Sequence, residues 1–394
     1  MVVKGFMVFY GRAARPPLNA PMFAKSARAG NVQVVQQGRA MTVSLGIIEG
    51  YYGKPWSWQA RTETVTFLKP HGYAFYLYAP KFDHFLRDRW AEDHPREEFE
   101  ELKKLSAHCR SLGVRFGVGL SPLNIFRDFN AGERKRLADK LAALDAIGLD
   151  DLALLFDDMR GDLPDLAKNQ VEISHFVEAH SKATRLIVCP TYYTDDPLLD
   201  RIFGQRPANY LEDFGKLLDP KIEVFWTGEE VCSREYSPGH LQRVSDQLRR
   251  KPFLWDNYPV NDGPRMSQYL HLRAFTGRPA SMGAHLSAHA VNPALQSVLS
   301  RIPSLSLAES YVKGERYEYG AAFLHAAEQV LGKELGLRVQ ADLLSLNDVG
   351  LDKLGERKEK LRARYVAFDH PGAQEIVAWL DGAYRIGADE MPTG

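Results

Sequence analysis

Residues 151–158 read DLALLFDD, a run of apolar residues that ends in two adjacent aspartates, Asp157 and Asp158. A short run that is apolar on both faces is typical of a strand in a parallel sheet, where helices cover both sides. Similar apolar runs recur along the chain, and longer amphipathic stretches separate them. The other seven runs comprise residues 43–50, 73–81, 114–122, 185–193, 222–228, 252–257 and 280–290.

The stretches between the runs have helical character. Residues 96–113 (REEFEELKKLSAHCRSLG) and 131–148 (AGERKRLADKLAALDAIG) carry apolar side chains at spacings of three and four, and each ends in glycine. Eight strand–helix units in about 250 residues predict an α/β fold, a (β/α)8 barrel of the TIM type. A doubly wound sheet is the alternative, but no glycine-rich phosphate-binding turn follows the first run.

The two ends of the chain differ from its middle. Residues 1–40 contain basic side chains but no Asp or Glu, and Met41 stands just before the first run. We expect a dispensable N-terminal extension, because no apolar core with a cleavage site follows the charges; a transit peptide is the alternative. The barrel is expected over residues 41–300. Helical patterns after it, at 321–336, 359–370 and 371–387, predict a C-terminal α-helical appendage over 301–394.

Composition limits the classes of partner. Basic and acidic residues number 50 each, so no net field favours nucleic acid or an anionic membrane, and no stretch of 18 apolar residues is present to span one. Three scattered cysteines predict reduced thiols in a cytoplasmic protein. His285 and His289 would lie roughly 13 Å apart on an extended strand. Neither a metal nor a cofactor is expected, and the sequence does not indicate an oligomeric state.

Polar or aromatic residues end seven of the eight runs, and in a barrel such ends converge on the face that carries the active site. These residues are Glu49, Gly50, Lys81, Asp157, Asp158, Tyr192, Tyr193, Thr227, Asp256, Asn257 and His289. Aromatic side chains at or near the same ends suit a sugar ring, whose CH faces pack on aromatic rings while its hydroxyls need polar partners. The aromatic residues are Tyr51, Tyr52, Tyr78, Tyr192, Tyr193, Trp226, Trp255 and Tyr258.

The aspartate pair is the strongest candidate for chemistry. Neighbouring strand residues point to opposite faces, so both carboxylates reach one pocket only if the strand ends there and the chain bends, which Gly161 allows. The alternative is that one aspartate faces the pocket and the other caps the next helix. Two carboxylates in one pocket should have divergent pKa values and so supply an acid and a base, although composition does not indicate which is which. A serine nucleophile is not favoured, because no GxSxG motif occurs.

Taken together, the runs resemble glycoside hydrolase family 84, the O-GlcNAcases and bacterial β-N-acetylglucosaminidases. Seven segments are similar to motifs of that family and follow in the family's order over about residues 45–295. They are GIIEGYYGKPWS (46–57), YLYAPK (76–81), LLFDD (154–158), CPTYY (189–193), FWTG (225–228), LWDNYPVND (254–262) and VNP (291–293).

The resemblance implies removal of terminal β-linked GlcNAc with retention of configuration. The substrate's own 2-acetamido group, rather than a protein nucleophile, would form an oxazoline intermediate. Asp157 would orient the acetamido group, and Asp158 would act as general acid and then as base. Matching motif positions imply that Gly50 (through its backbone), Lys81, Asn257, Asp262 and Asn292 hold the sugar hydroxyls. They also imply that Tyr193 donates to the acetamide oxygen, and that Thr227 and Trp255 enclose the acetamido pocket.

Two segments depart from the family pattern. Tyr192 stands where a polar residue is expected, and residues 121–126 read SPLNIF instead of SPGLDI. Both departures lie beside the aspartate pair and bear on the choice of leaving group. The expected partner is a GlcNAc-bearing glycoconjugate or glycoprotein. The alternatives are a hydrolase of free or cell-wall-derived GlcNAc oligosaccharides and a carbohydrate-binding barrel that has lost catalysis.

Overall fold

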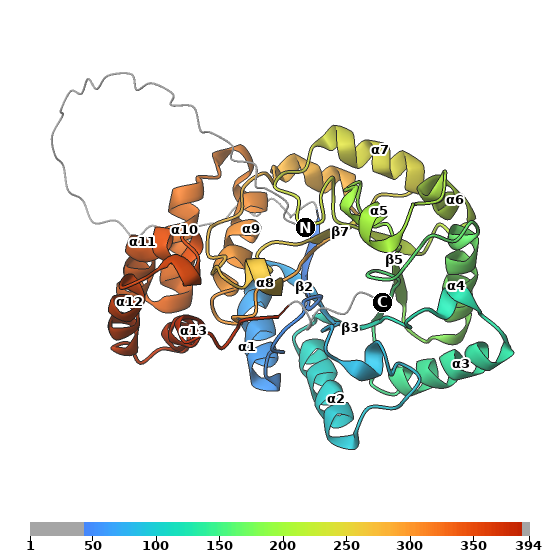
Figure 1. Cartoon of the computed structure of the whole chain (residues 1–394), viewed down its shortest axis with the longest axis horizontal. Coiled ribbons are helices and arrows are strands. Elements are labelled where there is room, and N and C mark those ends of the chain that lie inside the picture. Colours follow the sequence, from blue (N-terminus) through green and yellow to red (C-terminus); the bar gives the residue numbers. More distant parts are fainter. Residues whose placement is uncertain (1–42, 388–394) are drawn as a thin grey trace, which may run out of the picture. The chain divides into compact units, whose positions relative to one another are not determined.

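The computed structural model describes residues 43–387, so the expected extension over residues 1–40 lies outside the described residues. Eight parallel strands form a closed barrel in which each strand pairs with the next and β8 pairs with β1 (Figure 1). The predicted (β/α)8 barrel is confirmed. The strands are β1 (Ser44–Ile48), β2 (Tyr73–Tyr78), β3 (Arg115–Leu120), β4 (Asp151–Leu155), β5 (Arg185–Cys189), β6 (Glu223–Trp226), β7 (Phe253–Asp256) and β8 (Ala288–Val291).

Helices surround the barrel on its outer side (Figure 1). Polar side chains cap several of them, as Ser57 does at the start of α1, where its hydroxyl accepts from Ala60 N at 3.1 Å. Ser237 caps α7 in the same way. The helices are α1 (Trp58–Leu68), α2 (Arg96–Ser111), α3 (Ala131–Asp145), α4 (Leu166–His180), α5 (Leu198–Phe203), α6 (Tyr210–Leu217), α7 (Pro238–Leu248), α8 (Gly263–Met266) and α9 (Arg301–Lys313).

The eighth strand is shorter than predicted. Residues 280–290 were expected to form one strand, but Ala280–His285 forms a 3-10 helix and only Ala288–Val291 pairs with β1 and β7. Pairing begins at Ala288 because Ser44 and Phe253, the first paired residues of β1 and β7 in this register, both lie opposite it. The expectation that His285 and His289 share an extended strand is therefore wrong.

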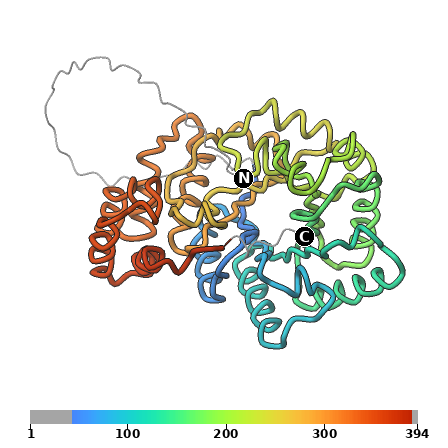
Figure 2. The backbone as a smooth tube through the Cα atoms, in the orientation of Figure 1, coloured from blue at the N-terminus to red at the C-terminus, as the bar shows by residue number. Residues whose placement is uncertain are grey.

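The C-terminal helices gather on the side of the barrel next to α9 (Figures 1 and 2). They are α10 (Tyr319–Leu331), α11 (Lys333–Asn347), α12 (Arg357–Val366) and α13 (Pro371–Leu380). The helical pattern predicted at 321–336 is interrupted at Gly332, whose φ of 78° is left-handed. Helix α9 itself packs on the barrel, since Tyr73 of β2 donates to Ser304 O at 2.9 Å. The helical layer of the barrel thus extends beyond residue 300.

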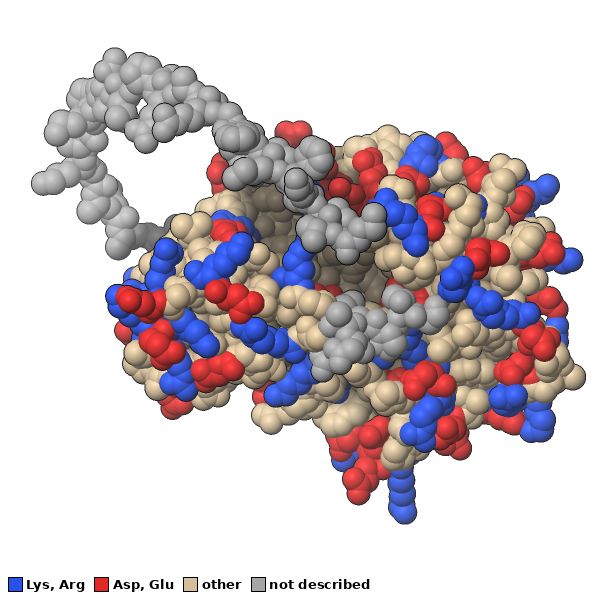
Figure 3. Space-filling view, viewed as in Figure 1, with Lys and Arg blue, Asp and Glu red and all other residues tan. Residues whose placement is uncertain are grey.

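The appended helices also support a loop of the barrel, the connection between β7 and β8. Trp379 of α13 donates to Ser267 O at 3.1 Å, and Leu270 N donates to Leu346 O of α11 at 3.0 Å. None of the described helices is long and apolar enough to cross a membrane. On the face shown in Figure 3, basic and acidic side chains of the described residues are interspersed, with no large area of one sign.

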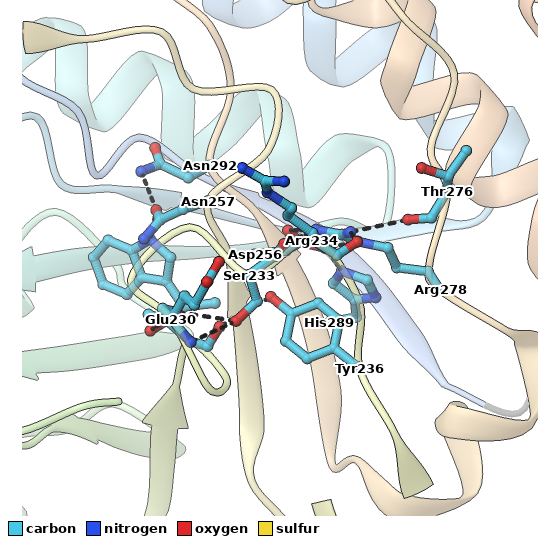
Figure 4. A network of polar contacts seen from close by, with 12 residues as sticks. Glu230, Ser233, Arg234, Tyr236, Asp256, Asn257, Thr276, Arg278, His289 and Asn292 are labelled. Atoms are coloured by element: carbon cyan, nitrogen blue, oxygen red, sulfur yellow. Dashed lines mark hydrogen bonds and ion pairs between the residues drawn. The ribbon is translucent and has the colours of Figure 1, made fainter. Parts of the chain in front are cut away.

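A buried ion pair joins β7, β8 and the loop that follows β6 (Figure 4). Asp256 is fully buried and accepts two hydrogen bonds from Arg278, at 2.7 and 2.9 Å. Arg278 also donates to Ser233 O at 2.8 Å, and His289 Nε2 lies 3.1 Å from Asp256 Oδ2. Burial alone would raise the pKa of Asp256, but Arg278 and His289 hold it below its usual value. The carboxylate is therefore ionised and compensated inside the protein.

We predict that Asp256→Asn lowers the free energy of unfolding by roughly 3–5 kcal/mol, because it leaves the Arg278 charge buried without its partner. Urea denaturation measures the change. The control is Asp381→Asn, which removes an ion pair that Arg362 makes at 2.8 Å with both side chains more than two-fifths exposed. The control should change stability little. Similar losses in the two variants would show that the buried pair has no special role.

Candidate active site

A cavity of about 140 Å³ lies at the C-terminal ends of the strands. All ten residues predicted to act in catalysis or substrate binding line it, although they come from seven different strand ends and loops. These are Gly50, Lys81, Asp157, Asp158, Tyr193, Thr227, Trp255, Asn257, Asp262 and Asn292. Five further residues complete the lining: Tyr52, Cys189, Val231, Cys232 and Val260.

Other predicted strand-end residues do not line this cavity. Glu49 is fully buried and accepts from Arg61 Nε at 2.7 Å, while Asp256 and His289 belong to the ion pair described above. Trp255 and Asn257, the two neighbours of Asp256, do line it, because successive side chains point to opposite sides of a strand. The prediction that the strand-end residues face the site is therefore wrong for Glu49, Tyr192, Asp256 and His289. Of the eight aromatic residues, only Tyr52, Tyr193 and Trp255 line the cavity.

The two segments that depart from the family pattern are also directed elsewhere. Tyr192 is fully buried, and its hydroxyl donates to Gly204 O at 2.6 Å. In the SPLNIF segment, Ile125 and Phe126 are buried in the hydrophobic core. Neither segment contributes a residue to the cavity lining.

The chain bends at the second aspartate. Strand β4 ends at Leu155, and Asp158 adopts a left-handed conformation with φ of 57°. Asp tolerates this conformation better than most residues with a Cβ. The bend was expected near Gly161, but it occurs at Asp158 and brings two adjacent carboxylates to one cavity.

Asp157 is paired with a cation. The residue is 5% exposed, and its Oδ2 forms an ion pair with Lys81 Nζ. Its other oxygen, Oδ1, is buried and has no hydrogen-bond partner in the described part of the chain. Asp157 therefore presents one acceptor that a donor on a bound molecule could satisfy.

Asp158 is held by two phenols. Tyr52 donates to its Oδ2 at 2.8 Å, Tyr193 lies 3.3 Å from its Oδ1, and Lys81 Nζ is 3.8 Å from Oδ2. Burial would raise the pKa of Asp158, but Lys81, Arg87 and the two phenols hold it below the usual value. The two carboxylates thus have different surroundings, which is the condition for different chemical roles.

The opposite wall consists of amides and one more carboxylate, and Figure 4 shows the two amides, Asn257 and Asn292. Gly50 N donates to Asn292 Oδ1 at 3.1 Å, and Asn292 Nδ2 donates to Asn257 Oδ1 at 2.8 Å. Trp255 Nε1 donates to the same Asn257 oxygen at 3.0 Å. These bonds fix both amide orientations. Asp262 accepts from Tyr52 N at 2.8 Å, and burial raises its pKa to about 6.

A larger cavity, about 470 Å³, lies at the opposite end of the strands. Arg115, Arg185 and Glu223, each the first residue of its strand, contribute to its lining. The fully buried Asp151 accepts from Arg115 Nε and Arg185 Nε, both at 2.9 Å. Because charges at the N-terminal face of such a barrel serve stability, we place the chemistry at the smaller cavity.

Some residues around the aspartates are not predicted from the sequence. The pattern predicts Tyr52 only as an aromatic surface, yet both its hydroxyl and its backbone N–H contact carboxylates. Arg87, Val231 and Cys232 carried no sequence signal, because their contacts with the site depend on loops that meet only in the fold.

The cavity requires glycine at position 50. A Cβ built on Gly50 would lie 1.9 Å from Cζ2 of Trp255, far inside contact distance. We predict that Gly50→Ala displaces Trp255 and with it the Asn257 amide. The variant should lose at least tenfold in kcat/KM on a β-GlcNAc glycoside, about 1.4 kcal/mol in the transition state, while remaining folded by circular dichroism.

The matched control is Gly320→Ala. Gly320 lies near the start of α10, and a Cβ there would meet no atom within 4 Å. Alanine at a helical position is favoured by roughly 0.5–1 kcal/mol over glycine. This control should keep full activity with unchanged or higher stability; unimpaired Gly50→Ala kinetics would contradict the assignment.

Comparisons with known proteins bear on the same residues. A family model described as beta-N-acetylglucosaminidase matches residues 45–344. The Protein O-GlcNAcase of Mus musculus is 32% identical over 286 residues, which are 70% of this chain and 30% of that protein. The Protein O-GlcNAcase of Rattus norvegicus is 32% identical over 267 residues, 65% of this chain and 28% of that protein. The chain therefore spans about 30% of the length of the mouse relative.

A solved structure agrees with these matches. A mutant of the Thermobaculum terrenum O-GlcNAc hydrolase superposes with a TM-score of 0.70 and 28% sequence identity, covering 86% of this chain and 80% of that one. The family model covers the barrel and both aspartates. This chain belongs to the beta-N-acetylglucosaminidase family, glycoside hydrolase family 84.

Proposed function

We propose that this chain is a retaining exo-β-N-acetylglucosaminidase that removes terminal β-linked GlcNAc by substrate-assisted catalysis. The observation that carries the proposal is the aspartate pair, in which Asp157 contacts an ammonium group and Asp158 contacts two phenols. In this proposal the acetamido oxygen attacks the anomeric carbon and the glycosidic bond breaks. Water then opens the resulting oxazoline.

Asp157 orients the nucleophile. Its unpartnered Oδ1 accepts the acetamido N–H, which turns the acetamido oxygen toward the anomeric carbon. As the oxazoline forms, positive charge develops on that nitrogen, and the adjacent carboxylate stabilises it. Lys81 holds the other oxygen of Asp157 and so limits rotation of the carboxylate.

Asp158 exchanges the proton. Its low pKa means that it is ionised at neutral pH in the free protein. A bound acetamide that takes the hydroxyl of Tyr193 removes one donor from Asp158, and the sugar excludes water; both changes raise the pKa of Asp158. The carboxyl group can then protonate the leaving oxygen and afterwards accept a proton from water.

The size of the cavity supports cleavage at a chain end. About 140 Å³ is below the roughly 300–1,000 Å³ of pockets for drug-sized ligands, so it suits one sugar unit. We propose GlcNAc on protein Ser or Thr as the substrate. Turnover of a GlcNAc-modified peptide against that of chitobiose separates this substrate from an oligosaccharide. The three free cysteines support a reducing compartment such as the cytoplasm.

The two aspartates can be separated by leaving group. For Asp158 we choose Asp158→Gly, because alanine at a φ of 57° would add backbone strain. Asp158→Gly should lose about 10²–10⁴-fold on a poor leaving group but much less on an acidic phenol, and added azide should restore turnover. Asp157→Ala should be slow on both substrates, because the acetamido group is then unoriented whatever departs. Steady-state kinetics on the two substrate types measures the difference.

Two outcomes would refute this mechanism. One is a rate that does not respond when the acetamido oxygen is made less nucleophilic by fluorination. The other is a glycosyl–aspartate adduct trapped on either residue, which would identify a protein nucleophile instead.

The raised pKa of Asp262 predicts how affinity depends on pH. Burial raises its pKa to about 6, and the charge of Asp158 adds to the effect. Below that pH the protonated group accepts hydrogen bonds poorly, so affinity for GlcNAc should rise as pH increases through about 6 and then level off. Asp262→Asn should bind more weakly and lose this step. Calorimetric titration between pH 5 and pH 8 measures both; a step that persists in the variant would assign the titration to another group.

A further inference from the structure

The connection between β2 and α2, residues 79–95, supplies cations to both aspartates. Lys81 pairs with the carboxylate of Asp157. Six residues later, Arg87 Nη2 lies 3.4 Å from the backbone oxygen of Asp158. One loop therefore contacts the aspartate pair twice, once at a side chain and once at the main chain.

This connection is itself firmly held. Asp83 accepts from Tyr78 OH at 2.9 Å and from Phe85 N at 3.0 Å. Ser121 N, at the end of β3, donates to Leu86 O at 2.7 Å, next to Arg87 in the chain. The guanidinium group of Arg87 therefore starts from a fixed backbone.

Arg87 differs from the other deeply buried arginines. Arg61 donates twice to Glu49, at 2.7 and 3.0 Å, and Arg278 donates twice to Asp256. Arg87 is only 5% exposed, yet within residues 43–387 no carboxylate lies within ion-pair distance of it, and its Nη1 has no hydrogen-bond partner. Burying an uncompensated guanidinium is costly, so its position calls for a reason other than stability.

The groups that interact with Arg87 supply that reason. The charges of Asp158 and Asp157 act on it more than that of its own neighbour Asp88, and its surroundings raise its pKa although burial lowers it. Among the described residues, the guanidinium group of Arg87 donates to the backbone oxygen of Asp158, whose left-handed backbone needs support. Arg87 does not line the cavity, so it acts on the site through Asp158.

We propose that Arg87 is a positioning residue for Asp158. Arg87 fixes the main chain of this aspartate, and the buried charge of Arg87 governs the proton exchange of the Asp158 carboxyl group. The proposal rests on the proposed function. Charged and titratable groups around Asp158 are Lys81, Arg87, Tyr52, Tyr193, Asp157, Asp262 and Cys189. Among them only Lys81 and Arg87 are cations, and Lys81 already pairs with Asp157.

The test compares Arg87→Gln with Arg87→Lys. Glutamine keeps a hydrogen-bond donor without charge, whereas lysine keeps the charge without the planar guanidinium. Without the charge, Asp158 should hold its proton to higher pH. The basic limb of kcat on a poor leaving group reports the pKa of Asp158 in the substrate complex, and it should therefore move up by about one pH unit in Arg87→Gln. The basic limb of the pH profile should not move in Arg87→Lys. In both variants kcat should fall more on the poor leaving group than on an acidic phenol, with KM little changed.

Arg301→Gln is the matched control. Arg301 is also partly buried and donates to a neutral oxygen, Thr64 Oγ1, at 3.2 Å, but it lies on α9 and its Nη2 forms an ion pair with Glu63 at 3.5 Å. This control should leave the pH profile unchanged. If Arg87→Gln does not fold, Arg87→Lys still decides the matter by its unshifted limb and leaving-group dependence.

A proportional loss on both substrates with an unshifted profile in Arg87→Gln would overturn the proposal and leave Arg87 a structural residue. A wild-type protein inactive on every β-GlcNAc glycoside would instead refute the proposed function. The two failures are therefore distinguishable.

Discussion

The site depends on how two consecutive buried carboxylates are kept in one cavity. They lose hydration and repel each other, so each needs compensation of its own. Lys81 supplies most of it: it contacts Asp157 and lies 3.8 Å from Asp158. At an effective dielectric constant of about 20, an attraction over such a distance is about 4 kcal/mol. Removing this one ammonium would leave two negative charges facing each other.

The groups that stabilise the two carboxylates also differ, and this difference bears on the role proposed for each aspartate. Asp157 faces an ammonium group, which cannot accept a proton from it and holds one oxygen in place. Asp158 faces hydroxyl groups of Tyr52 and Tyr193, which a bound sugar can redirect. A carboxylate with exchangeable neutral donors can change its proton affinity during a reaction when those donors move to the substrate. This difference supports the proposal that Asp158, rather than Asp157, exchanges the proton.

Much of this arrangement could be predicted from the sequence, and the exceptions have physical causes. The apolar runs revealed the strands because a strand covered on both faces must be apolar throughout. The ten cavity residues were found because strand ends converge and because the motifs resemble a family. Glu49 and His289 were misplaced because a run does not reveal which side of the strand each residue faces. The run at 280–290 was misjudged because strand pairing depends on β1 and β7, far away in the sequence.

Arg87 could not be found from the sequence for the same kind of reason. Asp158, the partner of Arg87, lies 71 positions away in the sequence. Nothing in the sequence of the loop distinguishes Arg87 from Arg89, which pairs with Glu92 on the surface. What separates the two residues is burial, and burial is a property of the fold. Local patterns therefore identify residues that touch a substrate more readily than residues that act through another side chain.

The C-terminal helices contact a loop that forms part of the cavity wall. The connection from β7 to β8 carries Asp262. After the short helix α8, residues 267–279 of this connection form no helix or strand. The connection bonds instead to the appended helices, at Ser267 O, Leu270 N and Gln268 O. Ile386 packs with Tyr51, Trp56, Val260 and Leu295 beneath the same wall of the cavity. The appended helices therefore bond to the same connection that carries Asp262 to the cavity.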